Sequence, residues 1–448
     1  MKVTIVGTGY VGLVTGTCLA SRGHRVACVD SDAHRVATIA RGAPPFHEPG
    51  LTELLGSALR DGRLTVGAAL EEAVADSDVS MLAVGTPSRE GRIDLSAVDA
   101  AATAVGRALG RREEYHVVVV KSTVVAGTTD TVVRRALEAG SGRPAGAFGL
   151  CMNPEFLREG SAVADFMRPD RIVVGCWDAR SAAVLDELYR GFDCPRIVTS
   201  LRNAEMIKYA ANALLATLVS YSNEVAALCE AMPGLDEETV MTGVHLDRRL
   251  TPVDGAAGPA GIVTYLRAGV GFGGSCLPKD VDALRGLAAE RGVATPLLDA
   301  VMAVNRQRAG QVVTNLGAAL GGLAGRVIAV LGLAFKPGTD DVRDSPAVAL
   351  IHGLLAAGAS VQAYDPLVRA VPALGGQVAL RPAPEAALAG ADAVVIATAC
   401  PEFRSLDWQA CARAMRRRVI LDGRDALRGV PLPEGVTYLR IGLGAPAG

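Results

Sequence analysis

The sequence predicts an α/β fold with two Rossmann-like, doubly wound domains joined by a long central helix and a helical middle domain. Apolar runs typical of buried parallel strands alternate with helical stretches at both ends of the chain. Between these ends, helical spacing continues from Asn203 to Met232 without a Gly or a Pro. The composition agrees, because 50% of the 448 residues are hydrophobic but only 4% are aromatic, as expected of buried strands and Ala-rich helices.

The first domain is expected over residues 1–200. Val3 to Val6 is a β-branched strand, followed by a Gly-rich turn and a helix to Arg22. Arg25 to Val29 is a second strand that ends at Asp30, which completes a βαβ unit. Further strands are predicted at Val79–Val84, Val117–Val120 and Ile172–Val174.

The middle domain is expected over residues 201–322. It contains the long helix, a loop rich in Gly, Pro and Ala at 251–261, and a second helix from about Pro296 to Leu320. A helix as long as the first is typical of a connecting or dimer-forming element.

The C-terminal domain, residues 323–448, repeats the plan of the first. Val327 to Leu331 is a strand followed by Gly332, and Val361 to Tyr364 is a strand that ends at Asp365. The strand-then-turn segments 78–87 and 392–401 also mirror each other. Ligand clefts in such folds lie at the carboxyl ends of the strands.

Composition excludes several classes of partner. Lys and Arg total 45 against 47 Asp and Glu, so we expect no nucleic acid or acidic membrane as a partner. The longest uncharged stretch, 309–325, is too short and too polar to span a membrane. The N-terminus runs straight into a strand and has no cleavage site, so we expect no signal peptide.

The cysteine pattern predicts that the protein is located in the reducing cytoplasm. The nine cysteines stand singly, with no CxxC pair and no Cys/His cluster, so neither a disulfide framework nor a metal site is expected. They lie at positions 18, 28, 151, 176, 194, 229, 276, 400 and 411.

The first motif is the glycine fingerprint Gly7-Thr8-Gly9-Tyr10-Val11-Gly12. It follows a strand, opens a helix and has Asp30 at the end of the next strand, which is the context of a dinucleotide site. Gly7 permits the tight turn, Gly9 admits a pyrophosphate, and Gly12 allows close packing of helix and strand. Asp30 favours NAD over NADP because it repels a 2′-phosphate. The alternative is a merely structural turn.

The second motif runs from Gly269 to Asp280 and contains Cys276. Four glycines in six residues predict a close approach of the backbone to a ligand. Pro278 suits a first helical turn, so Cys276 is expected just before a helix N-terminus, where the helix dipole and Lys279 favour its thiolate. The alternative is a small buried hydrophobe. The other eight cysteines lack such surroundings and are interpreted as core or incidental residues.

Two further motifs place polar side chains at a spacing of four. Asn153-Pro154 is interpreted as the start of a helix that places Glu155 and Glu159 on one face; the alternative is acidic capping of that helix. Lys208 and Asn212 share a face of the long helix with small alanines beside them, which would let a ligand lie there, but the pattern alone favours a solvated lysine.

The fifth motif is the segment from Phe335 to Pro346. Here Gly332-Leu333-Ala334 replaces the glycine fingerprint, so no second dinucleotide site is expected. Lys336 and Arg343 are candidates for contact with nucleotide phosphates. The alternative is a loop of paired charges.

Together these segments resemble the UDP-glucose/GDP-mannose dehydrogenase family over nearly the whole chain. Besides the motifs above, the resemblance rests on 84–87, on Lys121-Ser122-Thr123 and on Asp422-Gly423-Arg424. The stretch 169–175 is more similar to UDP-glucose 6-dehydrogenases than to GDP-mannose enzymes.

The resemblance implies oxidation of the C6 alcohol of a nucleotide sugar to a carboxylate, with two NAD and a homodimer. Cys276 would attack the intermediate aldehyde, and the thiohemiacetal would become a thioester that water hydrolyses. Lys208 and Asn212 would stabilise the oxyanion. Asp280 and Thr123, with Glu155 or Glu159, would order water and relay protons.

The resemblance also implies two sets of binding residues. Those for NAD are Gly7, Gly9, Tyr10, Val11, Gly12, Asp30, Arg35, Thr86, Thr123, Glu159 and Arg343. Those for the nucleotide sugar are Glu155, Phe156, Leu157, Arg158, Glu159, Lys208, Asn212, Arg249, Tyr265, Leu266, Arg267, Ala268, Gly269, Gly273, Lys336 and Arg424.

The chain departs from the family's pattern in places. Arg35 stands where relatives often carry Lys, and Asp425 follows Arg424 where relatives usually have Asn. Relatives carry an Arg sixteen residues before the Cys that reaches the neighbouring subunit's substrate, but Ala260 stands there. The segment 246–250 resembles the Arg-bearing one, displaced by about eleven residues, 251–261, so Arg249 is the candidate for that role.

Other functions stay open at this point. UDP-glucose is the expected substrate, with GDP-mannose or another nucleotide sugar as the alternative. The first half of the chain alone would also suit a two-electron hydroxyacid-type dehydrogenase, and the whole chain a non-catalytic sensor of NAD or nucleotide sugars.

Overall fold

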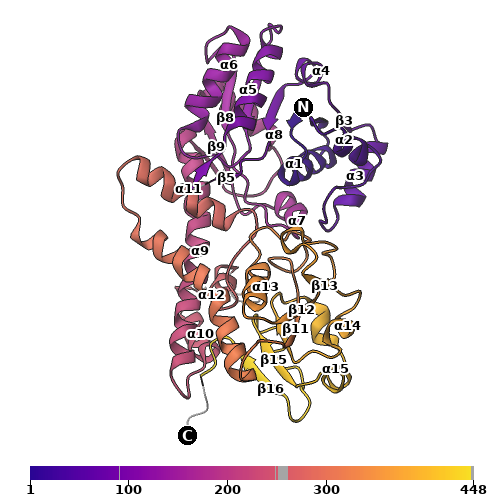
Figure 1. The fold of residues 1–448 in the computed structure, drawn as a ribbon. Helices are drawn as coiled ribbons and strands as arrows, with labels where there is room; N and C mark the ends of the chain where they lie inside the picture. The colour runs from indigo at the N-terminus through magenta and orange to yellow at the C-terminus, as the bar shows by residue number, and fades with distance from the viewer. Residues whose placement is uncertain (90, 248, 251–260, 445–448) are drawn as a thin grey trace. The chain divides into compact units, whose positions relative to one another are not determined.

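The computed structural model describes residues 1–89, 91–247, 249–250 and 261–444. The chain forms two compact units, the first from Met1–Ala211 with Asp282–Glu290 and the second from Asn212–Val281 with Arg291–Gly448. Helices α9, Leu201–Ala231, and α11, Leu277–Glu290, each contribute residues to both units (Figure 1).

The first unit is built on an eight-stranded sheet with the order β10-β9-β8-β7-β4-β1-β2-β3. Neighbours are parallel except β8 and β9, which pair antiparallel, so β9 and β10 run against the rest. The described strands of this unit also include a short antiparallel pair, β5 and β6. The bounds are β1 Lys2–Val6, β2 Arg25–Val29, β3 Leu64–Gly67, β4 Val79–Leu82, β5 Ser88–Arg89, β6 Arg92–Ile93, β7 Val117–Val120, β8 Gly149–Met152, β9 Ile172–Cys176 and β10 Arg196–Thr199.

Apolar side chains fill both faces of this sheet. In β7, Val117 and Val119 join one core cluster and Val118 and Val120 the other, because successive side chains of a strand point to opposite faces. Helices cover the sheet, as expected for a largely parallel one. Their bounds are α1 Tyr10–Ser21, α2 Ala33–Ala40, α3 Leu51–Arg60, α4 Leu70–Ala75, α5 Ser96–Leu109, the π-helix η1 Thr129–Val133, α6 Arg134–Ser141, α7 Ala162–Met167 and α8 Ala179–Leu188.

The second unit is built on a six-stranded, all-parallel sheet with the order β13-β12-β11-β14-β15-β16. In β11, Ile328 and Val330 join one core cluster and Ala329 and Leu331 the other. The strands are β11 Val327–Leu331, β12 Ser360–Tyr364, β13 Val378–Leu380, β14 Ala393–Ile396, β15 Val419–Asp422 and β16 Thr437–Arg440.

The helices of the second unit begin and end where the sequence supplies caps. Helix α12 has Pro296 in its first turn and ends before Gly321, whose φ is 68°. Helix α13 begins at Pro346, and the hydroxyl of Ser345 accepts a bond from the Ala347 N–H. The bounds are α10 Glu237–His245, η2 Gly261–Tyr265, α12 Pro296–Leu320, α13 Pro346–Ala356, η3 Pro372–Leu374, α14 Pro384–Leu388, η4 Pro401–Ser405 and α15 Trp408–Ala414.

The predicted fold class is confirmed, with corrections in detail. The second predicted middle helix has the observed bounds, and the long helix is shifted by one or two residues. The strand predicted at Val79–Val84 ends at Leu82, while the one predicted at Ile172–Val174 continues to Cys176. Most of the predicted loop at 251–261, with Ala260, lies outside the described residues. Among the described helices none is long and apolar enough to cross a membrane.

Candidate active site

The glycine fingerprint forms a tight turn between β1 and α1 in the first unit. Gly7 has a φ of +97°, which only glycine adopts readily. A Cβ on Gly12 would lie 1.9 Å from the Gly7 carbonyl oxygen, whereas a Cβ on Gly9 would meet no described atom within 4 Å. Gly7 and Gly12 are therefore required by the fold itself, and Gly9 leaves the turn open on the side where helix α1 begins.

Asp30 stands directly after β2 and is 8% exposed. Its Oδ2 accepts bonds from the Thr8 N–H and hydroxyl, both at 2.7 Å, and from Arg35 Nη1 at 3.1 Å. Burial alone would raise the pKa of this carboxyl, but the bonds from the Asp32 and Thr8 N–H groups and from Arg35 outweigh it and hold the pKa below its usual range. Asp30 is therefore ionised and fixed beside the turn.

The remaining expected NAD contacts of the first unit lie close to parallel strands. Thr86 comes after β4 and donates its hydroxyl to the Thr123 carbonyl at 2.9 Å, and Thr123 comes after β7. Val11 lies in the first turn of α1 and Glu159 in the turn before α7. Because the carboxyl ends of parallel strands share one sheet edge, the fingerprint, Asp30, Thr86 and Thr123 lie along that edge.

The segment from Asn153 to Glu159 is not a helix, which corrects the prediction. It has no regular structure, and a helix begins only at Ala162. Asn153 does not cap a helix, because its side chain forms hydrogen bonds with Lys121, Tyr189 and the Val173 carbonyl instead. Glu155 and Glu159 therefore do not share a helix face.

Glu155 and Lys208 form a buried ion pair. Their Oε1 and Nζ atoms are 3.0 Å apart, and the side chains are 5% and 4% exposed. The second oxygen of Glu155 accepts the Leu157 N–H at 2.6 Å, and the Lys208 ammonium lies 5.5 Å from the centre of the Phe156 ring. The alternative of a solvated Lys208 is wrong, since the long helix turns this side chain into the interior.

Lys121 belongs to the same buried cluster, although its sequence motif indicated no role for it. Its ammonium donates to Asn153 Oδ1 at 2.9 Å. Desolvation lowers the pKa of Lys121 to about 8, and the nearby Lys208 adds to this effect while Glu155 opposes it. The first unit thus holds two buried ammonium groups near one buried carboxylate.

Glu48 ties the fingerprint to the acidic segment, and no sequence pattern indicated it. This buried carboxylate accepts the hydroxyl of Tyr10 and, at 2.7 Å, the Gly160 N–H. Burial and the Glu48 charge raise the pKa of Tyr10, so its phenol stays a donor. The position of the Glu155–Glu159 segment is therefore set by a residue more than a hundred positions earlier.

The other side chains of the Asn153–Glu159 segment contact neighbouring residues of the first unit. Arg158 pairs with Asp165 at 2.6 Å, and the Arg171 guanidinium lies 3.8 Å from the centre of the Phe156 ring. Leu157 packs against one core cluster and Phe156 against the other.

In the second unit, Cys276 stands immediately before helix α11, as predicted. Its carbonyl accepts the Asp280 N–H at 2.8 Å, and Pro278 lies in the first turn. The sulfur lies 3.6 Å from the Ser275 hydroxyl and is partly exposed. A thiol here faces the positive end of a helix dipole, which favours its anionic form.

Asp280 organises the residues around this helix start. It is 1% exposed, and its two oxygens accept one bond each at 2.6 Å, from Asn212 Nδ2 and from Lys279 Nζ. Lys279 therefore neutralises Asp280. Asn212 is held with its amide nitrogen on the carboxylate, which leaves the carbonyl side of the amide and its second N–H to other partners.

The glycine loop is close-packed against the protein itself. A Cβ on Gly273 would lie 2.1 Å from the Asp344 oxygen, and one on Gly274 2.8 Å from the Phe335 ring. At these two positions the space that a side chain would need is thus occupied by the loop 335–344.

Three side chains that sequence patterns did not reveal fix the glycine loop. Asn305 accepts the Phe272 N–H at 2.8 Å and donates to the Phe272 carbonyl at 3.0 Å. Asn223 accepts the Gly269 N–H at 2.8 Å, and Arg308 donates to the Gly269 carbonyl at 3.1 Å. They come from α9 and α12, so the two long helices of this unit hold the loop that precedes Cys276.

Arg424 stands two residues after β15 and faces the same loop. It donates to the Ala397 carbonyl at 3.1 Å and to the Gly271 carbonyl at 2.8 Å. Desolvation lowers the pKa of Arg424 to about 10, and within the described part of the chain no carboxylate pairs with its guanidinium. It therefore offers positive charge to an anion at the carboxyl edge of the second sheet.

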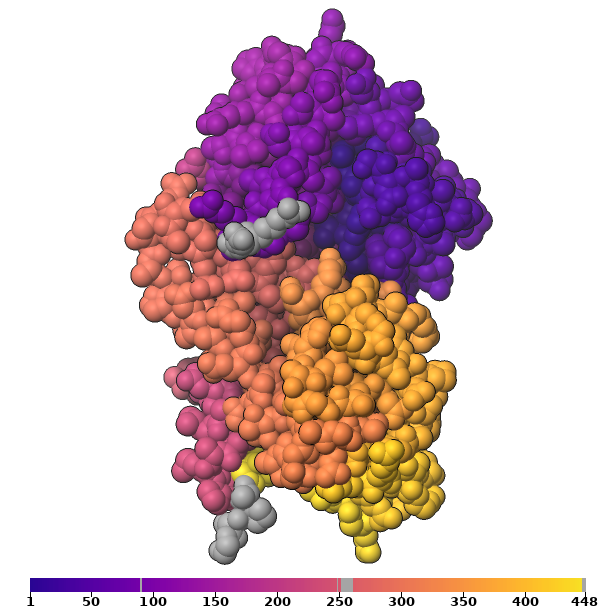
Figure 2. Space-filling view, viewed as in Figure 1, coloured from indigo at the N-terminus to yellow at the C-terminus, as the bar shows by residue number. Residues whose placement is uncertain are grey.

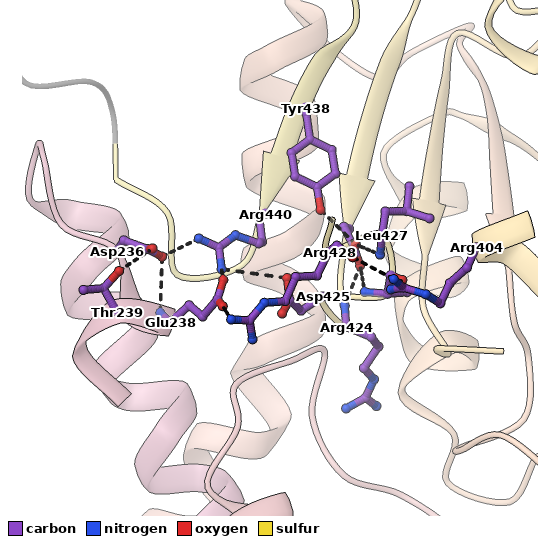
Figure 3. A network of polar contacts seen from close by, with 12 residues as sticks. Asp236, Glu238, Thr239, Arg404, Arg424, Asp425, Leu427, Arg428, Tyr438 and Arg440 are labelled. Atoms are coloured by element: carbon purple, nitrogen blue, oxygen red, sulfur yellow. Dashed lines mark hydrogen bonds and ion pairs between the residues drawn. The ribbon is translucent and has the colours of Figure 1, made fainter. Parts of the chain in front are cut away.

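The neighbours of Arg424 form a separate charged network (Figure 3). Arg440 pairs with Asp236, with Glu238 at 2.7 Å and with Asp425 at 3.8 Å, while Arg428 pairs with Glu238. Figure 3 shows Arg424 pointing away from these pairs. Asp425, where relatives usually have Asn, is thus a member of the network that joins β16 to α10.

The other predicted nucleotide contacts of the second unit are dispersed. Arg343 is exposed and pairs with Asp341 through both oxygens, and the Lys336 ammonium lies 5.7 Å from the Phe335 ring centre. Arg249 is 88% exposed and pairs with Asp247. Between Tyr265 and Gly269, Leu266 is buried, Arg267 exposed and Ala268 intermediate. Gly269, at the end of the Tyr265–Gly269 segment, lies beside the Arg424 side chain. The Arg249 side chain is exposed at the surface.

The described residues contain no group of three or more His, Cys, Asp or Glu side chains that could hold a metal. The residues at the carboxyl edge of the first sheet fit NAD, because the turn is open at Gly9 and a fixed carboxylate stands at the end of the second strand.

Comparisons with known proteins cover the whole chain. Residues 1–193, 202–307 and 329–429 match the NAD binding domain, the central domain and the UDP binding domain of the UDP-glucose/GDP-mannose dehydrogenase family. The chain is 41% identical to the UDP-glucose 6-dehydrogenase TuaD of Bacillus subtilis, covering 100% of this chain and 94% of that one. It is 43% identical to the UDP-glucose 6-dehydrogenase of Rhizobium meliloti, covering 99% of each. A solved UDP-glucose dehydrogenase of Pyrobaculum islandicum matches with a TM-score of 0.89 and 40% identity, over 98% of this chain and 97% of that one.

Proposed function

Because the chain belongs to the UDP-glucose/GDP-mannose dehydrogenase family, we propose that it is an NAD-dependent UDP-glucose 6-dehydrogenase. It oxidises the C6 alcohol of UDP-glucose in two steps to the carboxylate of UDP-glucuronate. NAD, held by the residues at the carboxyl edge of the first sheet, would supply the hydride acceptor for both steps. The observation that carries this proposal is the placement of a partly exposed thiol, Cys276, at the start of α11, one turn before the buried Asp280.

The thiol explains how one site performs two oxidations. An aldehyde has no second hydride to give until a nucleophile adds to it. Cys276 adds to the C6 aldehyde and forms a thiohemiacetal, whose C6 hydrogen leaves as hydride to give a thioester. Water then hydrolyses the thioester, and the sulfur departs as a thiolate that the helix start stabilises.

The buried charges supply electrostatic stabilisation. Lys208 is held by Glu155, and Asn212 one turn later on α9 is held by Asp280. We assign to Lys208 and Asn212 the stabilisation of negative charge on the C6 oxygen. Thr123 and Glu159, with the carboxylates of Glu155 and Asp280, order the hydrolytic water and carry its proton.

We assign the nucleotide to the loop before Cys276. Arg424 provides a buried positive charge for the diphosphate, and Lys336 a second cation. The Tyr265–Gly269 segment and Gly273 supply backbone groups for the nucleoside. Phe156, Leu157 and Arg158 shape the sugar side, and Arg343 joins Arg35, Thr86 and the fingerprint in holding NAD.

The proposed assembly is a homodimer in the cytoplasm. Leu214, Tyr221 and Leu228 recur every seven residues on α9 and are 54%, 50% and 61% exposed, which is typical of a helix face covered by another chain. The α9–α10 segment lies at the surface of the second unit (pink in Figure 2). In a dimer, the exposed Arg249 of one copy is a candidate to reach the nucleotide sugar of the other. The nine cysteines, all of them in the described residues, form no disulfide, as a reducing compartment allows.

The test is the amount of NADH formed per UDP-glucose consumed, which is expected to be two. Cys276→Ser should lower carboxylate formation by about 10³-fold or more, because a hydroxyl is a poorer nucleophile and leaving group. Cys194→Ser, which also changes a partly exposed thiol, should leave the rate unchanged.

Other outcomes would identify a different function. A ratio near one with full activity in Cys276→Ser would indicate a simple two-electron dehydrogenase. Tight binding of NAD or UDP-glucose without turnover would indicate a sensor. Faster turnover of GDP-mannose than of UDP-glucose would overturn the proposed substrate but not the cysteine chemistry.

A further inference from the structure

Two cysteines face each other across the antiparallel junction of the first sheet. Cys151 in β8 is the register partner of Cys176 in β9, and their sulfurs are 3.4 Å apart. The Trp177 N–H donates to the Leu150 carbonyl at 2.9 Å, so the neighbouring residue pair is the hydrogen-bonded one. The cysteines therefore occupy a non-hydrogen-bonded position, where Cα atoms approach to about 4.5 Å.

This spacing is within reach of a covalent bond. Disulfides join residues whose Cα atoms are roughly 4.4–6.8 Å apart. We propose that Cys151 and Cys176 are a modification site, at which a low-molecular-weight disulfide converts the two thiols into a reversible cross-strand disulfide. The proposal concerns these two thiols alone, because it rests on the contact between their sulfurs.

The two thiols differ in the way that a stepwise exchange requires. Cys151 is fully buried, whereas Cys176 is the last residue of β9 and is partly exposed. The Cys151 S–H donates to the Cys176 sulfur, and this bond lowers the pKa of the Cys176 thiol while the same contact and burial raise that of Cys151. Cys176 is thus the attacking thiolate and Cys151 the resolving group.

The exchange balances in two steps. The Cys176 thiolate attacks one sulfur of the small disulfide, whose S–S bond breaks and releases one small thiolate. Cys151 then gives up its proton to solvent and attacks the Cys176 sulfur, which releases the second small thiol. The protein loses two electrons and two protons, and the small disulfide becomes two thiols. A reducing dithiol returns both cysteines to thiols and is itself oxidised to a disulfide.

The bond would close the base of a functionally placed loop. The chain between the two cysteines contains the Asn153–Glu159 segment and helix α7. Asn153 lies two residues after Cys151 and bonds both Lys121 and the Val173 carbonyl of β9. Oxidation would therefore staple the two strands from which this segment leaves and to which it returns. The cysteine pair as a modification site does not depend on the proposed dehydrogenase reaction.

The experiment is a peptide map of the folded protein under non-reducing conditions. The full chain is incubated with hydroxyethyl disulfide, unreacted thiols are blocked with an alkylating reagent, and the digest is analysed by mass spectrometry. We expect one linked peptide pair joining Cys151 to Cys176, two hydrogen masses lighter than the sum of the free peptides. Dithiothreitol should abolish it.

Matched variants separate the proposal from general thiol reactivity. Cys194→Ser removes another partly exposed thiol and should leave the link intact, whereas Cys151→Ser should retain the small thiol on Cys176 as a stable adduct. Circular dichroism spectra before and after oxidation confirm that the reaction occurs in the folded state. The proposal is overturned if the wild type accumulates the Cys176 adduct without the link, or if the linked peptides join other cysteines. Because the readout is a mass, its failure leaves the dehydrogenase assignment untouched.

Discussion

The turns that open the two sheets share a backbone plan but differ in what they leave accessible. In the first, the Gly7 N–H donates to the Val29 carbonyl and the Thr8 N–H to Asp30, at 2.8 and 2.7 Å. In the second, the Gly332 N–H donates to the Tyr364 carbonyl and the Leu333 N–H to Asp365, again at 2.8 and 2.7 Å. Both glycines have a strongly positive φ, +97° and +88°.

The two turns diverge immediately after this glycine. Beyond Gly7, helix α1 begins at Tyr10 and the turn is open at Gly9. Beyond Gly332, Leu333 and Ala334 are buried and the next helix starts only at Pro346. Asp30 accepts a hydrogen bond from a cationic side chain. Asp365 instead accepts hydrogen bonds from four backbone N–H groups, those of Leu333, Ala334, Leu367 and Val368. One turn is built to receive a ligand, and the other is filled by its own chain.

The sharpest way to test this contrast is to add a methyl group to each of two glycines of the first turn. Gly12→Ala places its Cβ against the Gly7 carbonyl, so it should cost at least about 3 kcal/mol or prevent folding. Gly9→Ala should fold normally, because its Cβ meets no described atom within 4 Å, and should weaken NAD binding about tenfold or more. Thermal unfolding and NAD titration measure the two effects. Equal destabilisation by both variants would contradict the open turn.

Replacing Asp30 and Asp365, which stand directly after β2 and β12, should separate effects on NAD binding from effects on folding. Asp365→Ala leaves three buried N–H groups and one partly buried N–H group without this acceptor and should cost about 3 kcal/mol or more, with NAD affinity unchanged. Asp30→Ala should destabilise by about 1–2 kcal/mol, yet lower NAD affinity about 100-fold and reduce discrimination against NADP. Denaturant unfolding measures the loss of stability, and titration with NAD and NADP measures the change in cofactor affinity. A loss of NAD affinity in Asp365→Ala would break the comparison.

Local patterns predicted the first turn because its information is local. A glycine at each crowded position, a strand before it and an acid after the next strand are all readable along the chain, and the same holds for Pro278 and Cys276 at the start of α11. The bounds of α12 are set by Pro296 and Gly321 at its ends. For the turn after Gly332, local patterns indicated only that the glycine fingerprint is missing, and they did not predict the burial of Leu333 and Ala334.

Long-range contacts decided what local patterns could not. Asn153-Pro154 has the form of a helix start, but Lys121 and Tyr189 occupy the Asn153 side chain and leave no cap. Glu48, Asn305 and Arg308 act through partners that are distant in sequence. The Cys151–Cys176 pair depends on the antiparallel pairing of β8 with β9, which no spacing along the chain encodes.

The charge of Asp30 should also appear in the acid stability of the first unit. Its pKa is lower in the folded protein than in the unfolded chain, so it stabilises the fold above about pH 4 and this contribution is lost as the pH falls through the folded value. Asp30→Asn should therefore lower stability at neutral pH and reduce the slope of stability against pH below about pH 4. Urea unfolding at a series of pH values measures it, and an unchanged slope would show that Asp30 is not held in its charged form.

The smallest effects on stability and NAD affinity are expected for Arg35→Lys, which keeps the positive charge and changes only the geometry of the cationic group. Arg35 is 38% exposed and reaches Asp30 through a single nitrogen at 3.1 Å, so Arg35→Lys keeps the attraction and loses one bond of fixed geometry. Partly exposed ion pairs contribute little, so stability should change by less than about 0.5 kcal/mol and NAD affinity by about two- to threefold. Arg35→Ala, which removes the charge, should weaken NAD binding more than Arg35→Lys does. If the two variants bind NAD equally, the guanidinium serves only Asp30 and Asp32, and the first turn differs from the second by its openness alone.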